Sequence, residues 1–313
     1  MTGKEKLQGH VIILVVNVLF AINISVSKSL IPAQLAPEAL TLLRILFATA
    51  MFWLSSLFAR REKVPLRDLS LLFLCACTGI AFNQSLFMAG LNMTSPVDTS
   101  IIATAGPIYV MLLAALILKE PITKQKVAGV MLGVAGGALV IIASTRTDDR
   151  SSSLGGDMLI VGSNLLYSVY VVISRPLSRR YSAITIMKWM FLFSAVMLTP
   201  FMYRHVQAAP VFRTGAADCE ALARIAFVLI GGTFVPYLLI PMSLKRLRPT
   251  TVSMYNYIQP IVASLLAVMA GQGSFTLDKL VATLLVFTGV YLVTMSKARE
   301  DDERDGPQPA DGK

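Results

Sequence analysis

Long apolar runs, separated by short polar turns, cover almost the whole 313-residue sequence. Each run has about 18 residues or more, enough for one helix to cross about 30 Å of hydrocarbon. Prolines and a Ser/Gly/Asp-rich stretch at 147–157 mark the turns. The pattern predicts an all-α integral membrane protein with ten transmembrane helices. The predicted helices span residues 9–30, 38–58, 68–90, 96–118, 126–144, 155–177, 182–203, 221–243, 250–270 and 277–296.

The two ends of the sequence depart from this pattern. Lys4 and Lys6 precede the first apolar run as in a signal peptide, but that run is too long for one and contains Asn17 and Asn23. We therefore expect it to be retained as the first membrane helix. The tail at 297–313 is charged and contains Pro and Gly, which predicts a disordered cytoplasmic segment.

The second half of the sequence repeats the first. Shifted back by 153 positions, it aligns without gaps across the third to fifth and the eighth to tenth predicted helices. The first two helices match the sixth and seventh at offsets of 147 and 144. The matched pairs include Gly79 and Gly232, Pro96 and Pro249, Pro107 and Pro260, Asn17 and Asn164, Lys28 and Arg175, and Arg44 and Lys188.

Each repeat, 9–144 and 155–296, contains five predicted helices. Because five is odd, the second copy enters the membrane from the opposite side, and the two repeats are predicted to be inverted. Inverted repeats are common in secondary transporters, because exchanging the conformations of the halves gives an inward-open and an outward-open state.

Composition and charge agree with a membrane protein. The chain is 55% hydrophobic and 15% charged, whereas soluble domains contain about 25% charged residues. The net charge of +10 comes from basic residues in the turns, which argues against nucleic-acid binding. With both termini inside, 19 lysines and arginines fall on the cytoplasmic side and 6 on the other. We therefore expect a cytoplasmic (inner) membrane protein with both termini in the cytoplasm.

The segment Pro107–Gly129, with LKEPITKQK at its centre, resembles the EamA domain, and Pro260–Ala282 is a weaker copy of it. The resemblance covers roughly 9–296. It implies two tandem copies that form a ten-helix transporter of the drug/metabolite transporter superfamily. It also implies export, or sometimes uptake, of amino acids and related metabolites without ATP. The copies differ at Lys119, Glu120 and Pro121 in the first, which are Gln272, Gly273 and Ser274 in the second.

Neutral polar side chains on the predicted helices are the candidates for substrate binding. Amides and phenols offer the donors and acceptors that suit a zwitterion or another polar metabolite in a cavity. The alternative is hydrogen bonding between helices, which stabilises a bundle by about 0.6 kcal/mol per contact. The candidates are Asn17, Asn23, Asn83, Gln84, Thr104, Asn164, Tyr167, Tyr255, Asn256 and Gln259.

Two of these amides favour recognition over packing. Asn256 and Gln259 lie one turn apart on the predicted ninth helix, whereas the matched positions of the fourth helix are Ala103 and Gly106. Packing alone would favour small residues in both copies. We therefore expect substrate to bind near mid-membrane, between the repeats and in contact with both amides.

Charged residues form a second candidate group. Lys28, Glu38, Arg44 and Asp98 are predicted near the outer surface, and charges at membrane depth cost about 2.5–3.5 kcal/mol on insertion scales unless they face protein or water. We interpret them as a cluster that gates the pathway or binds substrate. The alternatives are structural ion pairs for Arg44 and Lys188, and extension of the Lys28 side chain to the interface.

Prolines and glycines suggest local helix geometry. Pro107 and Pro260 each remove a backbone donor within a predicted helix and predict kinks at equal depths, although membrane helices also tolerate proline without such a role. Gly129, Gly133 and Gly137 form a small-residue ridge that is typical of close helix packing or of a homodimer face.

No motif for catalysis is present. The sequence lacks a Walker A motif, HExxH, a nucleophile elbow and paired carboxylates, and its three cysteines have neither metal-ligand nor disulfide spacing, so we expect no enzyme and no cofactor. Glu38, Asp98 and Asp157 are weak candidates for carrying protons.

We expect a secondary transporter that exports small polar metabolites such as amino acids by alternating access. Its partners would be the substrate, membrane lipid and, in a homodimer, a second copy. Two alternatives remain open. One is a translocator of lipids or lipid intermediates on the same fold, with Arg44 and Lys188 at a lateral opening; the other is a membrane sensor or assembly protein without transport.

Overall fold

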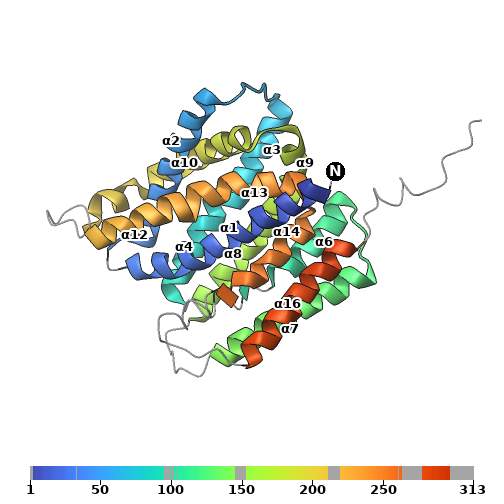
Figure 1. Ribbon diagram of the computed structural model, residues 1–313. Helices are drawn as coiled ribbons and strands as arrows, with labels where there is room; N and C mark the ends of the chain where they lie inside the picture. The colour runs from blue at the N-terminus through green and yellow to red at the C-terminus, as the bar shows by residue number, and fades with distance from the viewer. Residues whose placement is uncertain are drawn as a thin grey trace, which may run out of the picture.

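Helices form the regular secondary structure in the described part of this computed structural model, and no strand occurs there (Figure 1). That part comprises residues 3–32, 34–94, 99, 102–103, 105–144, 153–210, 219–259, 261–262 and 277–296. The elements are α1 (Gly3–Leu30), α2 (Pro37–Phe58), α3 (Leu66–Ala76), η1 (Cys77–Ala81), α4 (Phe82–Met93), α6 (Gly106–Leu118), α7 (Lys124–Ser144), α8 (Leu154–Ile173), α9 (Arg175–Arg180), α10 (Ala183–Ala208), α12 (Cys219–Leu229), η2 (Ile230–Phe234), α13 (Val235–Arg246), α14 (Pro249–Met254), η3 (Tyr255–Tyr257) and α16 (Leu277–Met295).

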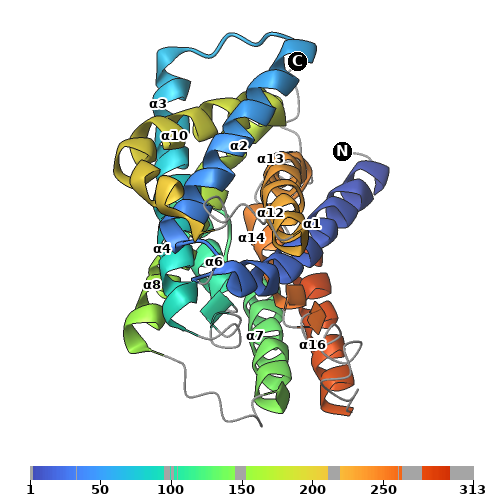
Figure 2. The same ribbon diagram turned by 90° about the vertical axis from the view of Figure 1, so that its left-hand side faces the viewer.

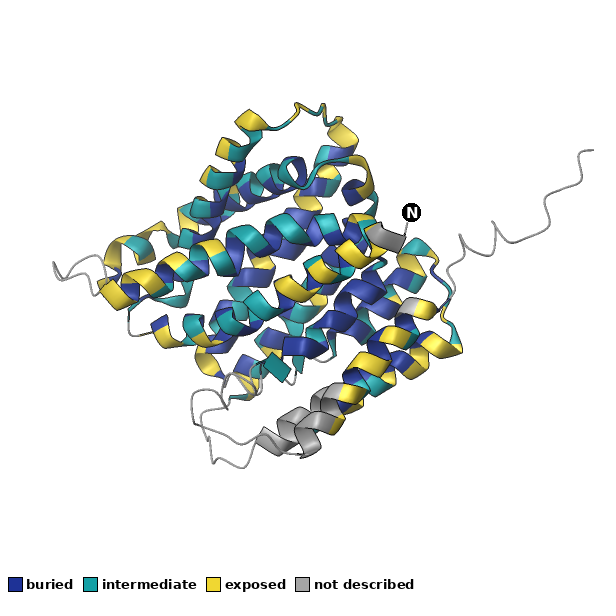
Figure 3. Cartoon of the chain, in the orientation of Figure 1, coloured by how far each residue is buried: buried dark blue, intermediate teal, exposed yellow. Residues whose placement is uncertain are grey.

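Six helical segments within the described residues are long and apolar enough to cross a membrane. They are α1, α2, α3 to α4, α8 to α9, α10, and α12 to α13, and α6 and part of α16 are shorter apolar helices. Exposed residues line the outer faces of α12 and α16 (Figure 3). Large apolar side chains are exposed on other helices as well, such as Leu116 of α6 and Phe201 of α10, which are 79% and 76% exposed. Such a surface suits lipid rather than water, and the chain is a multi-pass membrane protein.

A π-helical turn interrupts two of the long segments. The turn η1 joins α3 to α4, and η2 joins α12 to α13. Their bounds differ by 153 positions, which is the offset of the sequence repeat. Each turn contains a glycine, Gly79 or Gly232, that has no room for a side chain. A Cβ would lie 2.4 Å from the Tyr170 side chain at Gly79 and 2.0 Å from the Asn23 side chain at Gly232. The two halves therefore share a local helix deformation, a feature that is rare and often functional.

Contacts between distant segments define one end of the helix bundle, which we call the terminal end. Gly9 lies against Leu247, and the Arg248 guanidinium donates a hydrogen bond to the carbonyl of Ser296. The described parts of the chain therefore begin and end on the same side of the bundle.

The opposite side, which we call the distal end, is joined by other contacts. The Lys28 ammonium donates to the carbonyl oxygen of Leu91 at 2.6 Å and to that of Thr94 at 3.0 Å. The Thr94 hydroxyl donates to the carboxylate of Asp157 at 2.6 Å. These contacts tie the end of α1 to the end of α4 and the start of α8.

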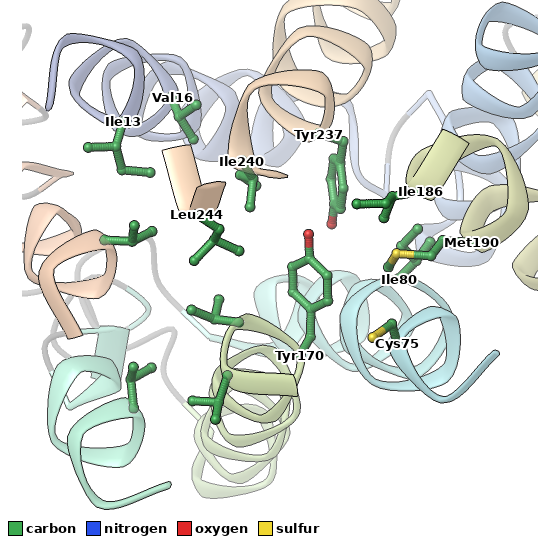
Figure 4. Close-up of a cluster of buried hydrophobic side chains, with 14 of the residues drawn as sticks. Ile13, Val16, Cys75, Ile80, Tyr170, Ile186, Met190, Tyr237, Ile240 and Leu244 are labelled. Carbon is green, nitrogen blue, oxygen red and sulfur yellow. The ribbon is translucent and has the colours of Figure 1, made fainter. Parts of the chain in front are cut away.

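Apolar packing between the long helices fills the centre of the bundle. Figure 4 shows Ile80, Ile186 and Met190 around the rings of Tyr170 and Tyr237, whose hydroxyl groups point toward one another. Both tyrosines are buried.

The helices α7 and α16 pack closely along one side of the bundle (Figures 1 and 2). A Cβ on Gly289 would lie 2.5 Å from the carbonyl oxygen of Gly129, and a Cβ on Gly133 would lie 2.2 Å from the ring of Tyr257. Small residues thus allow two backbones and one ring to approach, as in other membrane helix pairs. The predicted ridge therefore faces a helix of the same chain at Gly129 and Gly133, rather than a second copy.

The helix prediction differs from the structure at the start of α6. Pro107 is the second residue of α6, after a turn at Ala105, rather than a kink inside a continuous helix. Proline fits the first turn, where its missing N–H would have no partner. The 3₁₀ turn η3 interrupts the ninth predicted helix near the matching depth, and Pro260 lies outside the described residues.

The orientation of the chain in the membrane is testable. Basic residues gather at the terminal end, so reporter fusions at residue 313 and in the 147–153 loop are expected to lie on opposite sides, with residue 313 in the cytoplasm. The measurement is the activity of a reporter that works on only one side of the membrane. The same reporter result at both positions would contradict the ten-helix, inverted arrangement.

Candidate functional site

A cavity of about 100 Å³ lies inside the helix bundle. Its walls come from α1, α2, α4, α8, α13 and η3, with further residues before α6 and after η3. Amide and aromatic side chains predominate, and the described lining residues include no carboxylate. The lining residues are Phe20, Asn23, Ile24, Arg44, Asn83, Gln84, Phe87, Thr99, Ala103, Ser163, Asn164, Tyr167, Tyr237, Asn256 and Gln259.

Arg44 is the one cation among the described lining residues and is only 4% exposed. It lies seven residues into α2, about 10 Å along the helix from the distal end. Its Nε donates to Thr233 Oγ1 at 2.7 Å, and its Nη2 donates to the carbonyl of Gly232 at 3.2 Å. Both acceptors belong to η2. No ion pair within the described part of the chain involves Arg44.

Two neighbouring amides of α4 join it to different helices. Asn83 Nδ2 donates to the carbonyl and hydroxyl oxygens of Ser163 at 2.8 and 2.9 Å. Gln84 Nε2 donates to the Tyr237 hydroxyl at 3.1 Å, and that hydroxyl donates to the carbonyl of Gly79 at 3.3 Å. This chain of bonds fixes the Gln84 amide, so that its nitrogen faces Tyr237.

Two polar atoms of the cavity wall lack a partner. Gln84 Oε1, an acceptor, and Asn164 Nδ2, a donor, are buried and make no hydrogen bond among the described residues. Buried polar groups are nearly always paired, and an unpaired one costs about 1–3 kcal/mol. A ligand that supplies a donor for Gln84 and an acceptor for Asn164 would remove that cost.

The predicted amide pair has two different environments. Gln259 Nε2 donates to Asn17 Oδ1 at 2.9 Å, which joins the ninth predicted helix to α1. Asn256 lines the cavity with its Nδ2 3.4 Å from the place a Cβ of Gly106 would occupy. The small residue matched to Gln259 thus makes room for the other amide.

The other predicted site residues lie elsewhere. Tyr255 bonds to His10 Nδ1 at 2.7 Å, away from the cavity wall. Glu38 is half-buried and makes no ion pair with Arg44, and Lys28 is held at the distal end. The role of Lys28, Glu38 and Arg44 as one charge cluster therefore stays a prediction. Thr104 and Asp98 lie outside the described residues.

The sequence reasoning missed several cavity residues, of which Phe20, Phe87 and Tyr237 are the largest. Tyr237 matches Gln84 at the repeat offset of 153, and the two side chains contact each other. Equivalent residues of two repeats can contact each other only near the axis that relates the repeats. Tyr237 could therefore have been found from the sequence as the polar residue that matches Gln84 at the repeat offset.

A buried ion cluster lies at the terminal end, and Glu120 of the LKEPIT segment is at its centre. Lys119 ends α6 in the left-handed region, with φ of 54°, and turns the chain so that Glu120 points inward. Glu120 pairs with Lys126 at 2.9 Å and with Arg175 at 2.7 Å, and it accepts a hydrogen bond from Thr250 at 3.1 Å. The cluster joins α7, α9 and α14 beyond the cavity.

Polar contacts at the ends of the spanning segments reinforce the same end. The Tyr181 hydroxyl donates to Asp68 at 2.6 Å, and this hydrogen bond raises the pKa of Tyr181 above its usual value. Burial opposes ionisation of Glu62, but hydrogen bonds from Thr185 and Ser182 outweigh it and lower the pKa of Glu62.

Among the described residues, no group of three His, Cys, Asp or Glu side chains could hold a metal ion. The chemistry of the cavity is therefore that of hydrogen bonding, ring contact and one fixed positive charge, which suits binding of a small organic molecule.

Comparison with known proteins supports a role in transport. The EamA-like transporter family matches residues 7–142 and 154–295. A WAT1-related protein of Arabidopsis thaliana is 25% identical over 314 residues, with 90% of this chain and 81% of that protein covered. An uncharacterized transporter of Archaeoglobus fulgidus is 24% identical, covering 84% and 90%. A solved crystal structure has the same fold, with a TM-score of 0.71 at 20% identity, covering 94% of this chain and 98% of that one.

Proposed function

Because the chain belongs to the EamA-like transporter family, we propose that it is a secondary transporter that exports small polar metabolites, such as amino acids, from the cytoplasm. The family is named for transporters, the Archaeoglobus fulgidus relative is named an uncharacterized transporter, and the chain is a membrane transporter rather than an enzyme. Substrate class, direction and mechanism belong to the proposal.

The observation that carries the proposal is the polar cavity within an apolar bundle. Six amide side chains and one cation line a space surrounded by helices that otherwise pack through apolar residues. Polar groups inside a membrane are costly and typically mark a pathway or binding site. Unpaired atoms on Gln84 and Asn164 support a ligand in that space.

Alternating access between two inverted repeats of five helices, 9–144 and 155–296, is the proposed mechanism. The contact between Gln84 and Tyr237, which both line the cavity, supports it, and so do the matched π turns, because the members of each pair are separated by the offset of the repeat. The Glu120 cluster supports a closed terminal end. The cavity could then face one side in this state and the other side after the halves exchange conformations.

A lipid translocator on the same fold has less support. Its expected feature was a lateral opening lined by Arg44 and Lys188. The Lys188 ammonium instead lies over the rings of Trp53 and Trp189, 5.4 and 6.0 Å from the ring centres. Arg44 lines the cavity, but Lys188 is not among the described lining residues.

The proposal is tested by an untargeted comparison of extracellular metabolites between strains that lack and that overproduce the chain. At least one small polar metabolite is expected to accumulate outside in proportion to the amount of protein. Identical extracellular profiles at confirmed membrane abundance would overturn the proposed export function.

Loss of the Asn256 amide is expected to weaken substrate binding. For Asn256→Ala the loss of one neutral hydrogen bond, about 0.5–1.5 kcal/mol, lowers affinity by up to about tenfold. Gln259→Ala is expected to lower affinity and also stability, because Asn17 loses its partner. The measurement is the half-saturation concentration of an identified substrate.

Thr288→Ala is the matched control, since Thr288 is exposed and bonds only within α16. If Asn256→Ala and Gln259→Ala both bind substrate as tightly as the parent and this control, the amides serve helix packing and the substrate site lies elsewhere.

A further inference from the structure

We infer that the cavity prefers substrates of net negative charge, small organic acids with one carboxylate, and that Arg44 is the residue that binds the carboxylate. The inference rests on the proposed function, because it takes the cavity to be the substrate site, and it narrows the proposed substrates from polar metabolites in general to organic acids rather than zwitterionic amino acids.

The positive charge of Arg44 is buried without a matching negative charge among the described residues. Its two hydrogen bonds go to a hydroxyl and a carbonyl, both neutral, of Thr233 and Gly232. A buried cation is costly unless it is paired. A substrate anion is the group that would complete this site.

The guanidinium has donors left for that anion. It carries five N–H groups, and two of them are used by the bonds from Nε and Nη2. The remaining three, including both on Nη1, make no hydrogen bond within the described part of the chain. The two oxygens of a carboxylate can each accept from one of two neighbouring N–H groups of a guanidinium, and this bidentate arrangement gives strong hydrogen bonds.

Charge balance distinguishes an acid from an amino acid. Binding a carboxylate with charge −1 makes the site neutral overall, whereas a zwitterion brings its own ammonium and leaves the net charge of the site at +1. The described wall provides no carboxylate to receive that ammonium. In a bundle surrounded by hydrocarbon, where charges are weakly screened, the neutral complex is favoured.

The rest of the cavity indicates what else the acid carries. Phe20, Phe87 and Tyr167 offer rings for an apolar or aromatic part. Asn164 Nδ2 can donate to a carboxylate oxygen, and Gln84 Oε1 can accept from a neutral hydroxyl or N–H group. The preferred class is thus an organic monocarboxylate with an apolar body and one neutral donor.

The test uses the purified full-length chain in lipid vesicles loaded with the water-soluble metabolites of a cell extract. Potassium and its ionophore on both sides hold the membrane potential at zero, and mass spectrometry follows release. We expect the metabolites released through the chain to be net anions. Zwitterions of similar size are expected to be released about ten- to a hundredfold more slowly, which is the effect of one charge-assisted hydrogen bond.

Two variants assign the preference to Arg44. Arg44→Gln is expected to lose the preference for anions, while Arg44→Lys keeps part of it because the charge remains and the planar pair of donors does not. Size-exclusion chromatography in detergent checks that both are folded. The charge of the metabolites that the parent chain releases decides the preference even where a variant does not fold.

Failure of this inference differs from failure of the proposed function. If no metabolite leaves through the parent chain, export itself is wrong, and the inference falls with it. If zwitterions or cations leave in preference to anions, the chain is a transporter and the charge preference is wrong. If a folded Arg44→Gln protein releases anions as the parent does, Arg44 is not the carboxylate-binding residue.

Discussion

Glu120→Gln is expected to destabilise the protein by about 3–5 kcal/mol, because breaking a buried ion pair leaves charges without compensation. The Glu120 side chain is 7% exposed, and its carboxylate holds Lys126 and Arg175, which are 2% and 14% exposed. Glutamine fills the same space but carries no charge. Two cations would then face each other at the terminal end, and Thr250 would lose a charged acceptor.

The measurement is the temperature at which the detergent-purified protein aggregates, with release from vesicles as a second readout. Glu120→Gln with Lys126→Gln is expected to recover part of the loss, since one unpaired cation is removed. Glu220→Gln is the matched control, because its ion pair with Arg224 is exposed and such pairs contribute about 0–1 kcal/mol. A Glu120→Gln protein as stable as this control would show that the cluster does not stabilise the terminal end.

Gly289→Ala is expected to separate α7 from α16 and to destabilise the protein by about 1–3 kcal/mol, the usual effect of overpacking. The added Cβ would meet the carbonyl oxygen of Gly129 at 2.5 Å and the amide nitrogen of Gly133 at 3.0 Å. Both are backbone atoms, so no side-chain rotation can relieve the contact. The helix pair itself must shift.

The same assay of aggregation temperature checks this result. Gly155→Ala is the matched control, because the nearest atoms to its new Cβ lie 3.5 and 3.6 Å away, an ordinary contact distance. Alanine also favours a helix over glycine by about 1 kcal/mol. If Gly289→Ala were as stable as Gly155→Ala, the two helices would not be held at the observed separation.

Much of the fold follows from patterns that the membrane imposes. Spanning helices must be long and apolar, so the run 38–58 predicts both ends of α2 within one residue, and the run 182–203 predicts the start of α10 within one residue, whereas α10 continues five residues further, to Ala208. The sequence does not predict the π turns. A π turn changes the backbone hydrogen bonds from i→i+4 to i→i+5 but leaves the run of apolar residues unchanged. The sequence predicts a kink at Pro107, whereas a new helix begins at Gly106. A proline is compatible with both, and the sequence does not show whether the helix continues through it or starts beside it.

The predicted site residues depend on different physics. Asn164, Asn256 and Gln84 come together at the cavity because polar groups in a membrane bundle gather away from lipid. Tyr255 could not be distinguished from them, since one residue of register on a helix turns a side chain by about 100°. The charged residues Lys28 and Arg44 were grouped by depth alone, and depth does not tell which helix face each occupies.

The ion cluster at Glu120 has no acidic counterpart in the second half, where the matched residue is Gly273. In a carrier with two states, opening the terminal end would separate Glu120 from two cations. That separation costs free energy, so the state that is open at the terminal end would be the less populated one. A solute that arrives from that side must find this minor population, and its apparent dissociation constant is the intrinsic one divided by the population. The same pocket would then half-saturate at a higher concentration from the terminal side than from the distal side. Such sidedness would arise without a single different contact to the solute.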